Sequence, residues 1–339
     1  MKASRMMRVR RTAFALSTVG LVLVAVFATS PGNAGTTRQE GKVKSIAFFG
    51  FAKANSFANA TWTGVQQKAK AKGVKATFFD PNFNAQTQVS QIQDAITSGK
   101  YQAFIIQAND GNAVVPSVKT ALKAGIAVVA EFTPVGPRYD TDKSQVPGMI
   151  FVGESPVANG VGLGTLAVQA CKGVNPCNVA YLEGFKALPL DNARTAAVKK
   201  TLGAAKNVKV VASVEGGYTA ASGLKAAQDV IQAHPDVNVI IGSSQAIQGA
   251  EQAVKSASLT GKVKLIGNGG SCQALAGVRS GRWFATYVLA EKSAGSIAAD
   301  LAIQSGNGVN VGSSFNTSKL VNPLGTKANL GTFKAQYCD

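Results

Sequence analysis

The side chains in this chain that could do chemistry are amides, hydroxyls and aromatic rings, and they gather just after predicted strands. The first such segment is 49–57, which offers Asn55, Ser56 and the rings of Phe51 and Phe57. The others lie at 107–110, 131–133, 183–185, 191–192, 242–245 and 268–271. Groups of these types hold small molecules by hydrogen bonds and ring contacts. They predict a polar pocket with aromatic walls.

We expect the ligand to contact twelve residues, eleven from these segments and one nearby tryptophan. They are Phe51, Asn55, Phe57, Asn109, Glu131, Phe132, Asp191, Asn192, Ser243, Ser244, Asn268 and Trp283. Some have a structural alternative. Asn55, Asn109 and Ser244 are residue types that cap helix N-termini, and Phe132 could be ordinary core at the end of a strand.

The sequence does not contain the parts of a common enzyme site. The single histidine, His234, falls in a loop between a predicted helix and a strand. Neither a Gly-x-Ser-x-Gly nucleophile motif nor a phosphate-binding Gly-x-x-x-x-Gly-Lys-Ser/Thr loop occurs. Residues 160–164 have three glycines with the wrong spacing for a dinucleotide site, and they fall in a probable helix, which favours close helix–sheet packing instead. We therefore expect a binding protein that is not an enzyme and needs no cofactor or metal.

Composition indicates a folded chain with a solvated basic surface. The 339 residues are 46% hydrophobic and 15% charged, with a formal net charge of +18. This length fits about two domains. The lysines are spread singly along helix-like segments such as 67–72 and are not grouped with exposed aromatic residues. A nucleic-acid partner is therefore disfavoured.

The first 34 residues have the pattern of a secretory signal peptide. A start rich in Lys and Arg precedes an apolar run over residues 13–28, and small residues lead to Ala34, after which we place the cleavage. An uncleaved anchor is the alternative. No cysteine lies near Ala34, so a lipoprotein is not indicated. We expect an exported protein in the periplasm or on the outside of the cell envelope.

The four cysteines predict two disulfides, because an even count behind an export signal is typical of oxidised proteins. Cys171 and Cys177 flank a short loop and are paired here; Cys272 and Cys338 pair by elimination. A metal site is a poor alternative, since the chain has one histidine and no Cys-x-x-Cys motif.

After residue 41 the chain alternates predicted strands and helices. Strands are expected near 43–50, 74–79, 103–107, 126–130, 179–182, 208–214, 239–241, 263–266 and 285–288. Helices are expected over 56–72 and 84–98, and a third runs to 124 with Asn109 or Asp110 as its cap. Six more helices are expected to begin near Pro156, Leu190, Ala220, Gln245, Ser271 and Glu291. The strands are continuously apolar, as in parallel sheets covered on both faces. Two such series, separated by a loop over 134–147, predict an α/β protein with two doubly wound lobes.

At this point the chain resembles the sugar-type periplasmic binding proteins of ABC importers, the ribose- and galactose-binding group. The residues that carry the resemblance are 54–57, 80–84, 88–93, 108–110, 125–129 and 233–237. The resemblance implies a type I fold with two lobes joined by a three-strand hinge, with crossings near Gly153, Ala290 and Asn316. The first lobe would hold 43–153 plus 290–316, and the second 154–289 plus 317–339.

The resemblance also implies a function, but the residues expected to bind the ligand differ from those of the family. Members of this family hold the sugar with charged or amide side chains at seven positions. At those positions this chain has other residues, namely Phe132, Thr133, Asn192, Ser243, Ser244, Gly269 and Leu289. A pocket poor in charge suits a ring less polar than a free sugar, because charge-assisted hydrogen bonds are the strong ones. We expect a monomer that delivers a small molecule to an ABC permease. The alternative is a sensor that presents its ligand to a chemoreceptor or kinase.

Overall fold

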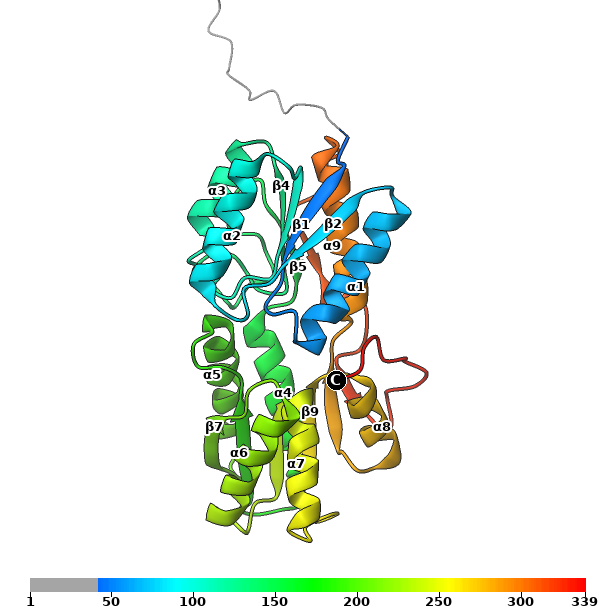
Figure 1. The fold of residues 1–339 in the computed structure, drawn as a ribbon. Helices are drawn as coiled ribbons and strands as arrows, with labels where there is room; N and C mark the ends of the chain where they lie inside the picture. The colour runs from blue at the N-terminus through cyan, green and yellow to red at the C-terminus, as the bar shows by residue number, and fades with distance from the viewer. Residues whose placement is uncertain (1–41) are drawn as a thin grey trace, which may run out of the picture. The chain divides into compact units, whose positions relative to one another are not determined.

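Two six-stranded sheets organise the part of the chain that the computed structural model describes, residues 42–339 (Figure 1). The predicted signal peptide, 1–34, lies outside the described residues. Each sheet is covered by helices on both faces, which confirms the predicted α/β class with two doubly wound lobes. No helix within 42–339 is long and apolar enough to cross a membrane.

The first lobe is built on a sheet whose strands all run parallel. In spatial order they are β2 (Lys75–Phe79), β1 (Ser45–Phe49), β3 (Ala103–Ile106), β4 (Ala127–Glu131), β5 (Ile150–Gly153) and β11 (Ser314–Asn316). Helices α1 (Ser56–Ala71) and α9 (Glu291–Gly306) pack together on one face, and α2 (Ala85–Ser98) and α3 (Val115–Lys123) cover the other (Figure 1).

The second lobe repeats this plan. Its strands are β7 (Val208–Glu215), β6 (Cys177–Glu183), β8 (Val239–Ser243), β9 (Lys264–Gly269), β10 (Ala285–Val288) and β12 (Leu324–Thr326). Helices α4 (Pro156–Ala170) and α5 (Pro189–Gly203) cover one face; α6 (Ala220–Ala233), α7 (Ser244–Ser256) and α8 (Cys272–Ser280) cover the other. Only β12 runs antiparallel to its neighbour in the described sheets.

The strand order reverses in the same way in both sheets. The chain runs outward from β1 to β2 and returns to β3, and it likewise runs from β6 to β7 and returns to β8. In doubly wound sheets the crevice at such a reversal, outside the carboxyl ends of the strands, is where ligands bind. Both lobes therefore offer a binding edge.

Local sequence explains why these elements form where they do. Every residue of β3 and β4 is buried, as expected for strands covered on both faces. Asn55 caps α1 by accepting a hydrogen bond from the Ala58 amide at 2.9 Å, and Asn84 caps α2 in the same way. Gly99 ends α2 in the left-handed conformation that glycine adopts without strain.

One predicted cap is wrong. Helix α3 begins at Val115 and has no side-chain cap, whereas Asn109 and Asp110 belong to the preceding turn. There Asp110 accepts hydrogen bonds from the amides of Asn112 and Ala113.

The chain passes between the two sheets three times. The passages follow β5, β10 and β11, next to Gly153, Ala290 and Asn316. We keep 43–153 plus 290–316 and 154–289 plus 317–339 as our proposed domain limits. The short strands β5, β11 and β12 were not predicted from the sequence.

The structure pairs Cys171 with Cys177 and Cys272 with Cys338, as predicted.

The glycines of 160–164 lie within α4 and allow close packing. A Cβ on Gly162 would lie 2.3 Å from the Tyr287 ring of β10, which is the predicted helix–sheet contact. A Cβ on Gly160 would lie 2.5 Å from the Arg194 carbonyl oxygen, and one on Gly164 would lie 2.8 Å from Thr201, so these two glycines pack against helix α5 instead of a sheet.

Candidate ligand-binding site

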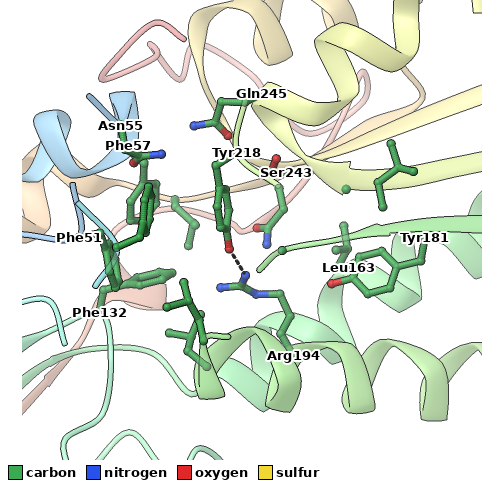
Figure 2. A pocket seen from close by; sticks show the side chains of 18 residues that line it. Phe51, Asn55, Phe57, Phe132, Leu163, Tyr181, Arg194, Tyr218, Ser243 and Gln245 are labelled. Carbon is green, nitrogen blue, oxygen red and sulfur yellow. Dashed lines mark hydrogen bonds between the residues drawn. The ribbon is translucent and has the colours of Figure 1, made fainter. Parts of the chain in front are cut away.

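A pocket that is partly open to solvent lies at the carboxyl ends of the strands of both sheets. From the first lobe it is lined by Phe51, Asn55, Phe57, Phe83 and Phe132. From the second lobe it is lined by Leu163, Tyr181, Leu182, Gly184, Leu188, Leu190, Arg194, Tyr218, Gly242, Ser243, Gln245, Asn268 and Leu289 (Figure 2). The two binding edges therefore contribute to one site.

Aromatic rings form most of the first-lobe wall. Phe132 stands at the centre, with its ring centroid 4.8 Å from that of Phe57 and 6.2 Å from that of Phe51, both edge to face (Figure 2). Phe83 lies parallel to Tyr218 of the second lobe, with centroids 6.0 Å apart. Rings from the two lobes therefore meet at the pocket, and they offer flat apolar faces to a ligand.

Two of these rings are held by an unusual backbone. Phe83 has φ of 59° and Phe132 has φ of 62°, in the left-handed region that bulky residues rarely adopt. Their amides are fixed by hydrogen bonds to the carbonyl oxygens of Phe51 and Val152, at 2.8 and 2.9 Å. Such strain persists where surrounding structure imposes it, and it concentrates at functional sites.

A buried ion pair forms the opposite side of the pocket. Arg194 donates to Asp191 at 2.8 Å, and both side chains are at least nine-tenths buried. Tyr218 donates to Asp191 at 2.5 Å. It also accepts from Arg194 at 3.3 Å (Figure 2). Burial raises the pKa of the Asp191 carboxyl, against the opposing effect of Arg194.

The geometry aims Arg194 at the aromatic wall. Its guanidinium carbon lies 5.9 Å from the centroid of the Phe132 ring. This is the range of a cation–π contact, so a ligand in the pocket would meet the cationic donor and the ring faces side by side. The pocket therefore suits a small ring with oxygen acceptors at one edge.

Comparison with known proteins agrees with this arrangement. The model of the family described as "Periplasmic binding protein domain" matches residues 46–308. This chain belongs to that family. The predicted resemblance to the sugar-type, ribose/galactose group of periplasmic binding proteins is confirmed.

Two curated relatives are named for sugars. The D-ribose/D-allose-binding protein of Pseudomonas aeruginosa is 30% identical over 184 residues, covering 53% of this chain and only 55% of that protein. The ribose import binding protein of Bacillus subtilis is 25% identical over 253 residues, covering 73% of this chain and 77% of that protein.

Two solved structures show the same fold. A solute-binding protein of Actinobacillus succinogenes with bound D-allose has a TM-score of 0.73 at 22% identity, covering 86% of this chain and 100% of its own. One from Bacillus halodurans with bound myo-inositol has a TM-score of 0.74 at 18% identity, covering 89% and 100%.

The structure of this periplasmic binding protein brings part of the expected site together. The expected residues that line the pocket are Phe51, Asn55, Phe57, Phe132, Ser243 and Asn268. Asn55 also caps α1, so it combines both roles that the sequence left open, and Ser243 caps α7, a role the sequence analysis had allowed for Ser244. Asp191 lies behind the lining and holds Arg194.

Other expected residues do not line the pocket. Asn192 is exposed and donates to the Lys186 carbonyl oxygen at 3.0 Å, because it lies on another face of α5. Asn109 and Ser244 are buried behind the strand ends, and Glu131 belongs to a buried network described below.

The expectation for Trp283 is wrong. Its side chain is 1% exposed and packs in the core under the second sheet, where its indole N–H donates to Glu251 at 2.7 Å. Space for the ring is left by Gly277, where a Cβ would lie 2.7 Å from the indole. Trp283 follows α8 and precedes β10, so it lies at the opposite end of the strand from the pocket.

The prediction of a pocket poor in charge did not include Arg194, which lines it. The sequence gives its spacing, three residues after Asp191 on one predicted helix, but not the face that this helix turns toward the pocket. Phe83 and Tyr218 were missed as well. Both follow strands, as the residues that were predicted do.

A second polar network lies behind the pocket, near the crossings. The Gln107 amide donates to Glu131 at 2.8 Å and to Thr61 at 3.0 Å, and Thr61 in turn donates to Glu291 at 3.2 Å. Burial raises the pKa of Glu131 to about 8, against the hydrogen bond from Gln107. Burial, with the nearby charge of Glu131, raises the pKa of Glu291 well above its ordinary value.

Glu154 adds a third buried carboxyl beside the first crossing. It accepts from Tyr287 at 2.9 Å and from Asn159 at 3.1 Å. Burial raises its pKa to about 7. Carboxyl groups that hold their protons near neutral pH therefore lie next to two of the three passages between the lobes.

Proposed function

We propose that this protein is an exported receptor that binds a small ring-shaped solute between its lobes and delivers it to an ABC permease. The observation that carries the proposal is the convergence of first-lobe rings and the second-lobe Arg194 on one pocket. Family membership supports the receptor role. The sugar names of its relatives support a sugar or sugar derivative as the ligand class.

We further propose that the ligand is less hydroxylated than a free hexose. Phe132 and Leu289 stand where the family resemblance expects polar or charged sugar-gripping groups, and both line the pocket. Arg194 supplies one strong donor for a ligand oxygen. A deoxy or methylated sugar, with one apolar face and one oxygen-rich edge, matches this division.

A thermal-shift screen tests both parts. The panel should hold D-ribose, D-galactose, D-allose, myo-inositol, deoxy and O-methyl sugars, and nucleosides. Ligand at 100 times its dissociation constant stabilises a protein by about 2.7 kcal/mol, which such a screen detects. We expect the largest shift from a deoxy or methylated sugar. Sub-micromolar binding of plain ribose or galactose contradicts the ligand class, and no shift from any small solute contradicts the receptor role.

A further inference from the structure

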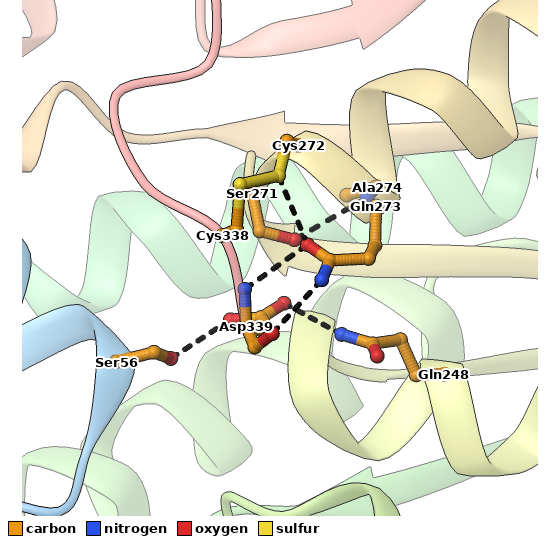
Figure 3. Close-up of a disulfide and its surroundings, with 8 residues drawn as sticks. All are labelled: Ser56, Gln248, Ser271, Cys272, Gln273, Ala274, Cys338 and Asp339. Carbon is orange, nitrogen blue, oxygen red and sulfur yellow. Dashed lines mark hydrogen bonds between the residues drawn. A yellow bond between two sulfur atoms is a disulfide. The ribbon is translucent and has the colours of Figure 1, made fainter.

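The segment Tyr337–Asp339 is fixed to the second lobe beside the pocket. Cys338 is bonded to Cys272 at the start of α8 (Figure 3). The Cys272 amide donates to the Tyr337 carbonyl oxygen at 2.9 Å. The side chain of Gln273 makes two hydrogen bonds to the main chain of Asp339. Its oxygen accepts from the Asp339 amide at 3.0 Å, and its nitrogen donates to the Asp339 carbonyl oxygen at 2.8 Å. The segment therefore has a defined position.

From that position Asp339 reaches the first lobe. One carboxylate oxygen accepts from the Ser56 hydroxyl at 2.9 Å, and the other accepts from Gln248 of α7 at 2.9 Å (Figure 3). The Ser56 hydroxyl also accepts from the pocket-lining Gln245 at 2.9 Å. A hydrogen-bond chain thus runs from Gln245 through Ser56 to Asp339 and joins the two lobes.

Tyr337 supports the aromatic wall from behind. Its ring lies edge to face with that of Phe57, with centroids 6.3 Å apart. Its hydroxyl fills the space beside Gly269, where a Cβ would lie 2.4 Å from that oxygen. Gly269 is the position where the family resemblance expects a sugar-gripping aspartate. The ring of Tyr337 therefore excludes a side chain from β9 there.

We propose that Tyr337 and Asp339 are positioning residues of the ligand site, held in place by the Cys272–Cys338 disulfide. Tyr337 fixes Phe57 by contact, and Asp339 fixes Ser56 and, through it, Gln245. Phe57 follows Ser56 directly at the start of α1, so both contacts hold the same part of the first lobe against the second. This inference rests on the proposed function, since it takes the pocket as the ligand site.

A double-mutant cycle tests the Asp339 contact. The variants are Ser56→Ala, Asp339→Ala and the pair together, with calorimetric titration of D-allose and of the strongest hit from the screen. Each single change should weaken binding about tenfold, because a hydrogen bond to a charged group is lost. The pair should weaken binding by less than the sum of the two single changes, since both remove the Ser56–Asp339 hydrogen bond. Asp229→Ala, which removes an exposed carboxylate on α6, should bind as the wild type does.

The disulfide is tested against the chain's other disulfide. Cys272→Ala/Cys338→Ala should weaken binding and speed amide hydrogen exchange over residues 57–60 in the ligand-bound protein, where the lobes are closed. Cys171→Ala/Cys177→Ala should lower the melting temperature and leave binding and that exchange unchanged. Wild-type exchange in the first pair, equal effects of both pairs, or additive effects in the Ser56 and Asp339 cycle would overturn the proposal. A wild type that binds none of the compounds contradicts the proposed function, whereas a wild type that binds beside an unaffected Cys272→Ala/Cys338→Ala variant contradicts only this proposal.

Discussion

At the scale of single residues, the pocket combines one buried guanidinium with several rings. Arg194 is held by Asp191 and Tyr218, and so keeps a fixed direction toward Phe132. Phe132 is itself fixed by a strained backbone. Pre-organised groups lose less freedom when a ligand binds, which favours affinity.

Phe132→Ala should weaken ligand binding more than Ser243→Ala. The ring contributes its face to the pocket, and we expect its loss to raise Kd at least about tenfold, or 1.4 kcal/mol. Ser243 uses its hydroxyl to cap α7 and to donate to the Gly217 carbonyl oxygen. Its loss should cost about 1 kcal/mol of stability and change Kd by less than about fivefold. Calorimetry and melting of both variants check this; wild-type affinity in Phe132→Ala contradicts it.

Asp191→Ala should destabilise the fold strongly. It leaves the Arg194 charge buried without its partner, which costs about 3 to 5 kcal/mol of unfolding free energy in comparable sites. Asp229→Ala breaks an exposed pair and should change stability by less than about 0.5 kcal/mol. Urea unfolding of the two variants gives the comparison. Equal stabilities would mean that the ion pair does not hold the pocket wall.

At the scale of elements, buried carboxyl groups connect β4 and α9. Glu131 ends the strand and Glu291 begins the helix, and Gln107 and Thr61 link them. Because the passage from β10 enters α9 at Glu291, the network lies where one crossing meets the first lobe. A charge on these groups would be costly in this buried position.

The free energy of unfolding should therefore fall as pH rises. The folded pKa of Glu131 is about 8, against an ordinary 4.5, so unfolding releases a proton between these values. The contribution is complete below about pH 4.5 and is lost toward pH 8, at up to about 1.4 kcal/mol per pH unit for each proton. Glu131→Gln should raise the melting temperature at pH 8 and have little effect at pH 5. An equal change at both pH values would show that Glu131 does not carry this dependence.

Elements also differ in how well the sequence predicts them. Strands such as β3 and β4 are continuous apolar runs between polar loops, so their own residues define them. Strands β11 and β12 have three residues each and are defined by pairing with β5 and β10, which a local pattern does not contain. The two lobes could therefore be predicted, but the short strands β11 and β12, each at one edge of its sheet, could not.

The site was predictable to a similar degree. Residues that directly follow strands, such as Phe51 and Asn268, could be placed at the pocket because parallel strand ends share one edge. Arg194 and Trp283 could not, since the orientation of a helix face or a core ring is set by tertiary packing. Arg194 reaches Phe132 only because α5 packs with its Arg194 face toward the pocket. Trp283 packs under the sheet, where Gly267 and Gly277 leave room for its ring.

At the scale of the whole molecule, contacts between the lobes close the pocket in this structure. The ring of Phe83 meets those of Phe185 and Tyr218, and Gln245 binds Ser56. The three crossings are the only covalent links between the sheets within residues 42–339. Such contacts can form and break as a unit, as domain closure around a ligand requires.

The central claim is that the two lobes close around a small solute, and small-angle X-ray scattering with and without the ligand found by the screen tests it most directly. We predict that the ligand-free protein has a larger radius of gyration than this structure, and that saturating ligand reduces it to the value calculated from the structure. An identical scattering profile with and without saturating ligand would contradict the claim, because it would mean a rigid pocket that binds without closure.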